Sequence, residues 1–266
     1  MTVYGIERIR EFLGNFKSNY IIIGGTATNI NLEESALEGR TTHDIDIIVV
    51  CEAVTKEYLE SFWKMIRTAG YEPGVINTDN GYKRTFYCFD KPKDSSFPKY
   101  IELFCRIPES IVLPEDIRIV HISNNYDDLS SFSAIMMDDE YYNFAIKHST
   151  QMQGVQVLDK FALIIFKSKA FVSNLTRKKS GQHVHQDDID KHKRDVYRLS
   201  FLLDEEYEEI DLPETIANDM RLFIRTIADY PINTKNISNY MGVAEINQRD
   251  FILKLEKVFN LSKLIR

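Results

Sequence analysis

The sequence predicts a mixed α/β (α+β) domain followed by an all-α helical bundle. Residues 1–137 alternate short apolar runs, typical of β-strands, with amphipathic stretches of helical period. From about residue 138 onward the pattern changes to long helical segments. A chain of 266 residues is long enough for two modest domains with cores of their own. We therefore expect one domain over residues 1–137 and a C-terminal helical domain over residues 138–266.

The apolar periodicity places the individual elements of the first domain. An amphipathic helix over residues 4–17 leads into a buried strand at 20–23, and a polar helix follows over 26–38. A second apolar strand covers residues 44–51, and a helix covers 55–69. Together these elements predict a mixed β-sheet with helices packed on it.

Further strands follow in the first domain. The Asn80-Gly81 pair is a hairpin signal within residues 74–90. Apolar runs at 100–105, 117–122 and 133–137 are the remaining strand candidates. In the second half, amphipathic helices are expected over the segments 157–172, from Asp187 to Leu199, 212–228 and 244–264.

Composition indicates an ordinary soluble protein. Apolar residues make up 44% and charged residues 27% of the chain, and no apolar run approaches the length that spans a bilayer. The N-terminal segment lacks the charged-then-apolar layout of a signal peptide. Cys51, Cys88 and Cys105 have no Cys-x-x-Cys spacing, which is typical of buried thiols in a reducing compartment. We therefore expect a cytoplasmic location and no membrane partner.

The charge distribution contains one basic patch in an acidic chain. The formal net charge is −7, so the molecule as a whole is not steered toward nucleic acid. Residues 167–198, however, carry nine Lys or Arg against four Asp, and phosphate-bearing partners are natural ligands of such a patch. The alternative is a solvated helix face stabilised by pairs four residues apart, such as Asp187 with Lys191 and Asp190 with Arg194. Charge alone does not decide between the two interpretations.

Two acids at alternate positions mark the first candidate site. Alternate residues of a strand share a face, so Asp44 and Asp46 lie together while Ile45 and Ile47 point into the core. Two neighbouring carboxylates repel each other unless a cation lies between them, and Mg²⁺ prefers carboxylate oxygens together with substrate phosphates. The alternative is that one acid faces solvent and the other pairs with Arg40.

Two further features surround this acid pair. Gly24-Gly25 follows a buried strand and precedes a helix, an arrangement in which backbone N–H groups receive a phosphate, and Thr26 can add a hydroxyl donor. Glu102 is the only acid in the apolar run 100–105. An isolated carboxylate in such a strand either lies on a solvent face or serves a site, and the presence of Asp44 and Asp46 favours the site.

These motifs resemble a known family. Gly-Gly-Thr at 24–26, followed by Arg-x-Thr-x-Asp-Ile-Asp at 40–46, is similar to the nucleotidyltransferase superfamily with a DNA polymerase beta-like palm. The resemblance is closer to the AbiEii/AbiGii toxin group of bacterial abortive-infection and toxin–antitoxin pairs. It implies a palm domain, with Asp44, Asp46 and Glu102 as catalytic acids that hold two Mg²⁺ (or Mn²⁺) ions. It also implies a nucleoside triphosphate bound by Gly24, Gly25, Thr26 and Arg40.

The resemblance extends into the helical part. Lys167 with Ala170, and Arg194-Asp195 with Leu199, match the toxin group's pattern. The implied roles are Lys167 on the nucleotide phosphates, and Asp195 near the catalytic centre as a base or as an anchor for that lysine. Where the family often has a second acid three residues after the Asp, this chain has Arg198.

The expected function is transfer of a nucleoside monophosphate from a nucleoside triphosphate to an acceptor hydroxyl. The favoured acceptor is RNA, above all a tRNA 3′ end held by the 167–198 patch, with an antitoxin protein as a possible partner. The alternatives are transfer to a protein side chain or to a small-molecule antibiotic, and an inactive module that binds nucleotide or antitoxin. His183-x-His185, with His192 beyond, lacks a fourth ligand at a recognised spacing, so zinc is disfavoured.

Overall fold

The computed structural model describes residues 3–78, 81–105, 135, 138–204, 206 and 208–261, and only the backbone of residues 73–78 and 81–87. The strands expected at 117–122 and 133–137 lie outside the described residues, apart from the buried Ile135. The described strands form one seven-stranded sheet in the order β3-β4-β5-β2-β1-β7-β6. Their bounds are β1 Tyr20–Ile23, β2 Asp44–Val49, β3 Glu72–Thr78, β4 Gly81–Asp90, β5 Tyr100–Phe104, β6 Ser149–Met152 and β7 Val155–Leu158.

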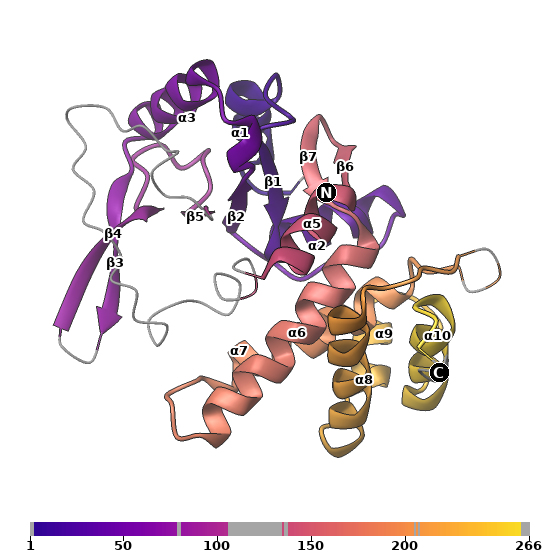
Figure 1. Ribbon diagram of the computed structural model, residues 1–266. Helices are drawn as coiled ribbons and strands as arrows, with labels where there is room; N and C mark the ends of the chain where they lie inside the picture. The colour runs from indigo at the N-terminus through magenta and orange to yellow at the C-terminus, as the bar shows by residue number, and fades with distance from the viewer. Residues whose placement is uncertain are drawn as a thin grey trace.

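The sheet is mixed, as the sequence predicts. Strand β2 pairs antiparallel with β1 and parallel with β5, and β1 pairs parallel with β7. The predicted hairpin is confirmed: β3 and β4 pair antiparallel, with Thr78 opposite Gly81. In Figure 1 this hairpin extends away from the rest of the molecule.

The helices of the first part are α1 Ile6–Leu13, α2 Gly24–Glu34, the 3₁₀ turn η1 Cys51–Ala53, and α3 Lys56–Ala69. Local signals define α3: the Thr55 side chain accepts a hydrogen bond from the Tyr58 N–H, and Gly70 ends the helix with φ 67°. Helices α1 and α3 pack on each other, whereas α2 follows β1 directly and contacts β2.

The second part contains the helices α5 Asp139–Lys147, α6 Lys160–Lys179, α7 Gln186–Ser200, α8 Glu214–Asp229, α9 Thr234–Met241 and α10 Gln248–Val258. Helix α6 packs against α7, α8 and α2, and α7 packs against α9 and α10. Figure 1 shows α6 running from the sheet into the helical part. Among the described helices, none has the length and apolarity needed to cross a bilayer.

The expectation that the chain is helical from residue 138 onward is wrong at residues 149–158. Strands β6 and β7 form a hairpin there and extend the sheet of the first part through the pairing of β7 with β1. Gln153 and Gly154 both have positive φ, 49° and 80°, as a two-residue hairpin turn requires. The helix expected from residue 157 begins instead at Lys160, where the Asp159 carboxylate accepts a hydrogen bond from the Ala162 N–H. Four-residue strands stabilised by tertiary pairing give too short a pattern to detect from sequence.

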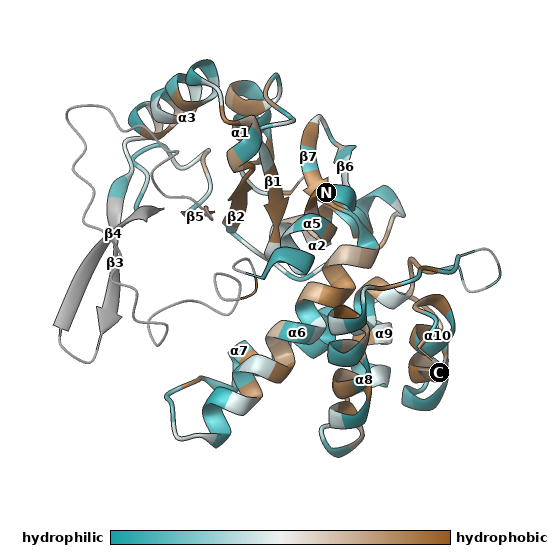
Figure 2. Cartoon of the chain, viewed as in Figure 1, coloured by the Kyte–Doolittle hydropathy of each residue, from teal (hydrophilic) through white to brown (hydrophobic). Residues whose placement is uncertain are grey.

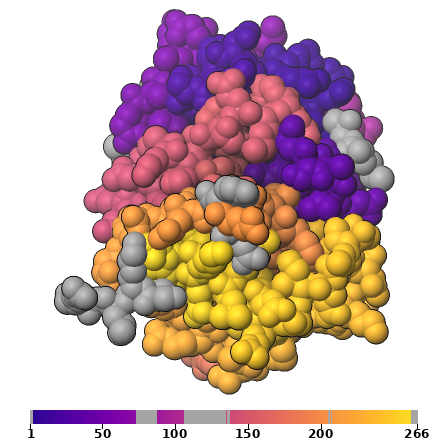
Figure 3. Space-filling view, turned by 90° about the vertical axis from the view of Figure 1, so that its right-hand side faces the viewer, coloured from indigo at the N-terminus to yellow at the C-terminus, as the bar shows by residue number. Residues whose placement is uncertain are grey.

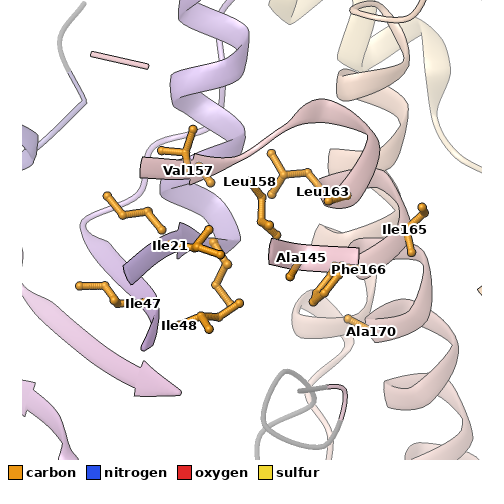
Figure 4. Packing of buried hydrophobic residues seen from close by; sticks show 14 of the residues in the cluster. Ile21, Ile47, Ile48, Ala145, Val157, Leu158, Leu163, Ile165, Phe166 and Ala170 are labelled. Atoms are coloured by element: carbon orange, nitrogen blue, oxygen red, sulfur yellow. The ribbon is translucent and has the colours of Figure 1, made fainter. Parts of the chain in front are cut away.

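The hydrophobic core joins the two parts. Ile21 and Ile47 of the sheet and Leu163 and Phe166 of α6 belong to one continuous cluster of buried residues (Figure 4). Figure 2 shows β1 as a hydrophobic strand near the centre of the sheet, beside β2, in which Asp44 and Asp46 alternate with apolar residues. In Figure 3 the N-terminal elements occupy one end of the molecule and the C-terminal helices the other. Helix α6 therefore holds its polar residues in a fixed position relative to the strands.

Candidate active site

The strand register brings the three candidate acids to one face of the sheet. In the parallel pairing of β2 with β5, Asp46 lies opposite Glu102 and Asp44 lies opposite Tyr100. Because paired residues of neighbouring strands point to the same face, the side chains of Asp44, Asp46 and Glu102 share that face. Asp44 is exposed, whereas Asp46 and Glu102 are partly buried.

The glycine bend lies directly against these acids. Ile23, the last residue of β1, pairs with Asp46, and Gly24 then starts α2 with φ 70°. A Cβ atom on Gly24 would lie 1.9 Å from Asp46 Oδ2, and one on Gly25 would lie 2.7 Å from Arg40 Nη2. Only glycine at these positions lets the backbone approach the carboxylate and the guanidinium so closely.

The environment of the acids disfavours their ionised forms. Burial raises the pKa of Asp46 to about 6, with the neighbouring Asp44 charge adding to the rise. Burial and the charges of Asp46 and Asp44 raise the pKa of Glu102 to about 8. Lys167 acts to lower the pKa of Asp46 and Lys191 acts to lower both values, but these charges do not offset the effect of burial.

The acids line a cavity of about 420 Å³ between the sheet and the helical part. Its walls also include the two glycines of the bend and residues from α6, α7 and the connection between them. The lining residues are Gly24, Gly25, Arg40, Thr42, Asp44, Asp46, Tyr100, Glu102, Lys167, Asn174, Arg177, His183, Val184, His185, Asp188, Lys191 and His192. The residues that line this cavity therefore include every site residue predicted from the sequence except Thr26 and Asp195.

Asp195 lies behind the cavity and fixes its cations. Its fully buried carboxylate accepts hydrogen bonds from Lys167 Nζ at 2.7 Å and from Arg198 Nη1 at 2.9 Å, and it lies 3.3 Å from Arg40 Nε. Burial alone would raise the pKa of Asp195, but Lys167 and Arg40 hold this pKa below its usual range. Arg198 thus contributes a third positive charge to Asp195.

Two sequence-based interpretations change in the structure. The Thr26 hydroxyl donates to the backbone carbonyl of Asp44 at 2.6 Å, so it joins α2 to β2 and is not directed to a bound phosphate. Arg40 forms its ion pair with Asp195, and among the described residues no ion pair joins it to Asp44 or Asp46, although its charge acts to lower the pKa of Asp46. The solvent exposure of Asp44 does agree with that alternative.

The basic patch is largely neutralised within the chain. Four of its cations pair with acids of the same helical region: Lys169 with Asp219, Lys191 with Asp188, Lys193 with Asp190, and Arg194 with Asp187. The pairs expected at four-residue spacing, Asp187 with Lys191 and Asp190 with Arg194, are not those that form. The side chains of Arg177, Lys178 and Lys179 instead contact neutral groups, namely Gln182, Gln186 and the Tyr230 ring. The cationic surface is therefore concentrated at the last turn of α6.

Sequence reasoning missed several lining residues, although some carried a signal. Tyr100 stands two residues before Glu102 and so shares its face of β5. Lys191 and His192 stand four and three residues before Asp195, and Asn174 stands seven after Lys167, which are spacings that place residues on one helix face.

His183 and His185 also line the cavity, and their rings meet edge to face at 4.7 Å. Among the described residues, no group of three or more His, Cys, Asp or Glu side chains forms a ready-made metal cage. No spacing or periodicity in the sequence predicts that these two histidines lie at the cavity.

A scan against models of known protein families matches none of them, and searches of curated proteins and of solved structures return no match. The chemistry of the cavity is therefore inferred from the residues of this chain alone.

Proposed function

We propose that the chain is a metal-dependent nucleotidyltransferase with a palm-like N-terminal domain, which transfers a nucleoside monophosphate from a nucleoside triphosphate to an acceptor hydroxyl. The observation that supports this most is the register of β2 and β5. It sets Asp46 beside Glu102 at the glycine bend, where both carboxylates have raised pKa values. Buried like charges are costly, and a cation-binding role explains why they are together.

The donor chemistry fits a hard divalent cation. Asp44, Asp46 and Glu102 offer carboxylate oxygens, the ligands that Mg²⁺ and Mn²⁺ prefer, and Cys88 of β4 pairs with Glu102 on the same face. These three acids would hold Mg²⁺ or Mn²⁺ together with oxygens of the substrate, in keeping with the reluctance of Mg²⁺ to enter an all-protein cage. When bound, such ions stabilise the negative charge on the entering and leaving oxygens of a phosphoryl transfer.

The other residues of the cavity supply positioning and charge. The backbone N–H groups at Gly24 and Gly25 open α2, so the helix N-terminus favours a phosphate there. Lys167 of α6 lines the same cavity and its ammonium group is paired with Asp195, so its positive charge lies close enough to help neutralise charge that develops on the phosphates. Glu102 is the carboxylate with the higher pKa, which suits it to accept the proton of the acceptor hydroxyl.

The proposed acceptor is RNA, in particular a tRNA 3′ end, and the proposed role is that of a toxin controlled by an antitoxin. Arg177 lines the cavity, and Lys178 and Lys179 continue its positive charge along the surface of α6. A polyanion could follow this cationic turn toward the acids. Because most of the patch is neutralised, we expect a short footprint and not a long groove.

Incubation of the pure protein with labelled nucleoside triphosphates, Mg²⁺ and total RNA or cell lysate tests the proposal. Label in RNA supports the proposed acceptor, and label in protein or in a small molecule redirects the acceptor. Asp46→Asn and Glu102→Gln should abolish labelling, whereas Glu38→Gln, at an exposed carboxylate outside the cavity, should not. Absence of label with every triphosphate would contradict transfer and leave an inactive binding module.

A further inference from the structure

Helix α7 carries two Lys–Asp pairs with the same spacing and different surroundings. Lys191 Nζ lies 2.8 Å from Asp188 Oδ1, and Lys193 Nζ lies 3.0 Å from Asp190 Oδ1, each pair spanning three residues. Both members of the first pair line the cavity that contains the acids, and neither member of the second pair does. Because the two pairs have the same spacing, a difference in anion binding between them can be assigned to the position of the first pair in the cavity.

The pair Lys193–Asp190 is built into the helical part. The Lys193 side chain is only 12% exposed, donates to the backbone carbonyls of Tyr230 and Pro231, and lies over the Phe171 ring at 5.8 Å. Several contacts at once hold this lysine in one position. We therefore expect it to stabilise the packing of α7 and to have no part in binding.

The pair Lys191–Asp188 is held far more weakly. The two side chains are 38% and 49% exposed, and Asp188 is the one partner found for Lys191 among the described residues. Exposed ion pairs of this kind contribute little, because water screens them and holding two long side chains costs entropy. A stronger anion in the cavity can therefore displace the Asp188 carboxylate from Lys191.

The position of Lys191 makes it a natural ligand for such an anion. It reaches the cavity from α7, across from the strands that carry Asp46 and Glu102, and its charge acts to lower the pKa of both acids. A phosphate placed between the two walls would meet Lys167 on α6 and Lys191 on α7. A phosphate also repels Asp188 and so weakens the resident pair.

We propose that Lys191 is a second phosphate-binding lysine, whose charge is occupied by Asp188 until a substrate phosphate replaces that carboxylate. This inference rests on the proposed function only for the identity of the substrate, a nucleoside triphosphate. Asp188 then acts as an internal competitor. Removing its charge tightens the binding of phosphate, whereas removing the lysine weakens it.

Binding of inorganic tripolyphosphate to the full-length chain tests this directly by isothermal titration calorimetry at low ionic strength. Lys191→Met should weaken binding about tenfold, which corresponds to about 1.4 kcal/mol of binding free energy. Asp188→Asn should strengthen binding about threefold. Lys193→Met and Asp190→Asn are the matched controls and should leave the affinity unchanged. In the Lys191→Met background, Asp188→Asn should strengthen binding by clearly less than threefold, because only the direct repulsion between Asp188 and the phosphate remains to be removed.

Equal affinities of the wild type and Lys191→Met, or weaker binding by Asp188→Asn, would overturn the inference. A thermal melt of each variant excludes unfolding as the cause. In the transfer assay, Lys191→Met should raise KM for the triphosphate and leave kcat nearly unchanged. If no transfer occurs but the tripolyphosphate pattern holds, the proposed function fails and the anion site stands.

Discussion

The two walls of the cavity treat charge in opposite ways. On the sheet wall, Asp46 and Glu102 stand side by side and burial raises their pKa values to about 6 and about 8. On the helical wall, the fully buried Asp195 is surrounded by Lys167, Arg40 and Arg198, which lower its pKa. The ionised carboxylates of Asp46 and Glu102 thus destabilise the sheet wall, whereas the ionised carboxylate of Asp195 stabilises the helical wall.

The opposite pKa shifts on the two walls indicate that the sheet wall is the one that would bind a cation. A buried charge that already has its partners is part of the scaffold, because removing one partner leaves the others uncompensated. Asp46 and Glu102 are neighbouring acids whose raised pKa values show that nearby lysines offset burial only in part, and a cation bound between them would relieve the remaining cost. We therefore expect substitutions on the two walls to change stability with opposite sign.

Asp195→Asn should give the largest effect, a loss of about 3–5 kcal/mol in the free energy of unfolding at neutral pH. The amide cannot balance the buried Lys167 ammonium. Because the folded pKa of Asp195 lies below the unfolded one, its contribution is present above about pH 4 and is lost as pH falls further. Urea unfolding at pH 7 and at about pH 2 measures the contribution before and after this loss. A second substitution, Lys167→Met, should restore part of the loss, and a variant as stable as the wild type would contradict the scaffold role.

Asp46→Asn and Glu102→Gln should each increase stability at pH 8 to 9, by an amount on the order of 2 kcal/mol. Raised folded pKa values mean that the unfolded state ionises first, so wild-type stability falls as pH rises from about 4 through the folded values of about 6 and about 8. The gain should vanish below about pH 3, where the carboxyl is protonated in both the folded and the unfolded state. Denaturant unfolding across this pH range measures the gain in the free energy of unfolding, with Glu38→Gln as the control. A gain that does not depend on pH would contradict the proposed contrast between the two walls.

Mg²⁺ should stabilise the wild type and not Asp46→Asn. A ligand that binds only the folded state at ten times its dissociation constant adds roughly 1.4 kcal/mol. The effect should be larger at pH 8 than at pH 5, because protonated carboxylates bind no cation. Thermal melts with Mg²⁺ or with a chelator measure the shift. An equal shift in Asp46→Asn would place the ion elsewhere.

The sequence predicts the acids of the sheet wall better than the scaffold that holds the helical wall. Alternation along a strand places Asp44 with Asp46, but the register that sets Glu102 beside Asp46 depends on which strands pair and in which direction. A role for Asp195 near the catalytic centre was expected only through the resemblance. Its contact with Arg40 joins residues that are 155 positions apart in sequence, so no local pattern predicts it. Likewise, hairpin β6–β7 depends on tertiary pairing with β1 and has little local signal.

Thr26→Val should give the smallest effect and sharpens the comparison from within the sheet wall. The Thr26 hydroxyl satisfies the Asp44 carbonyl, so its loss should cost about 1 kcal/mol of stability. If the hydroxyl instead contacts a phosphate, as the sequence suggested, KM for the triphosphate should rise and stability should change little. Thr26→Ser keeps the hydroxyl and should behave as the wild type in both assays. A loss of stability at constant KM would show that the Thr26 hydroxyl, already paired with the Asp44 carbonyl, stabilises the fold and does not bind substrate. The carboxylates would then be the groups of the sheet wall that take part in binding and reaction.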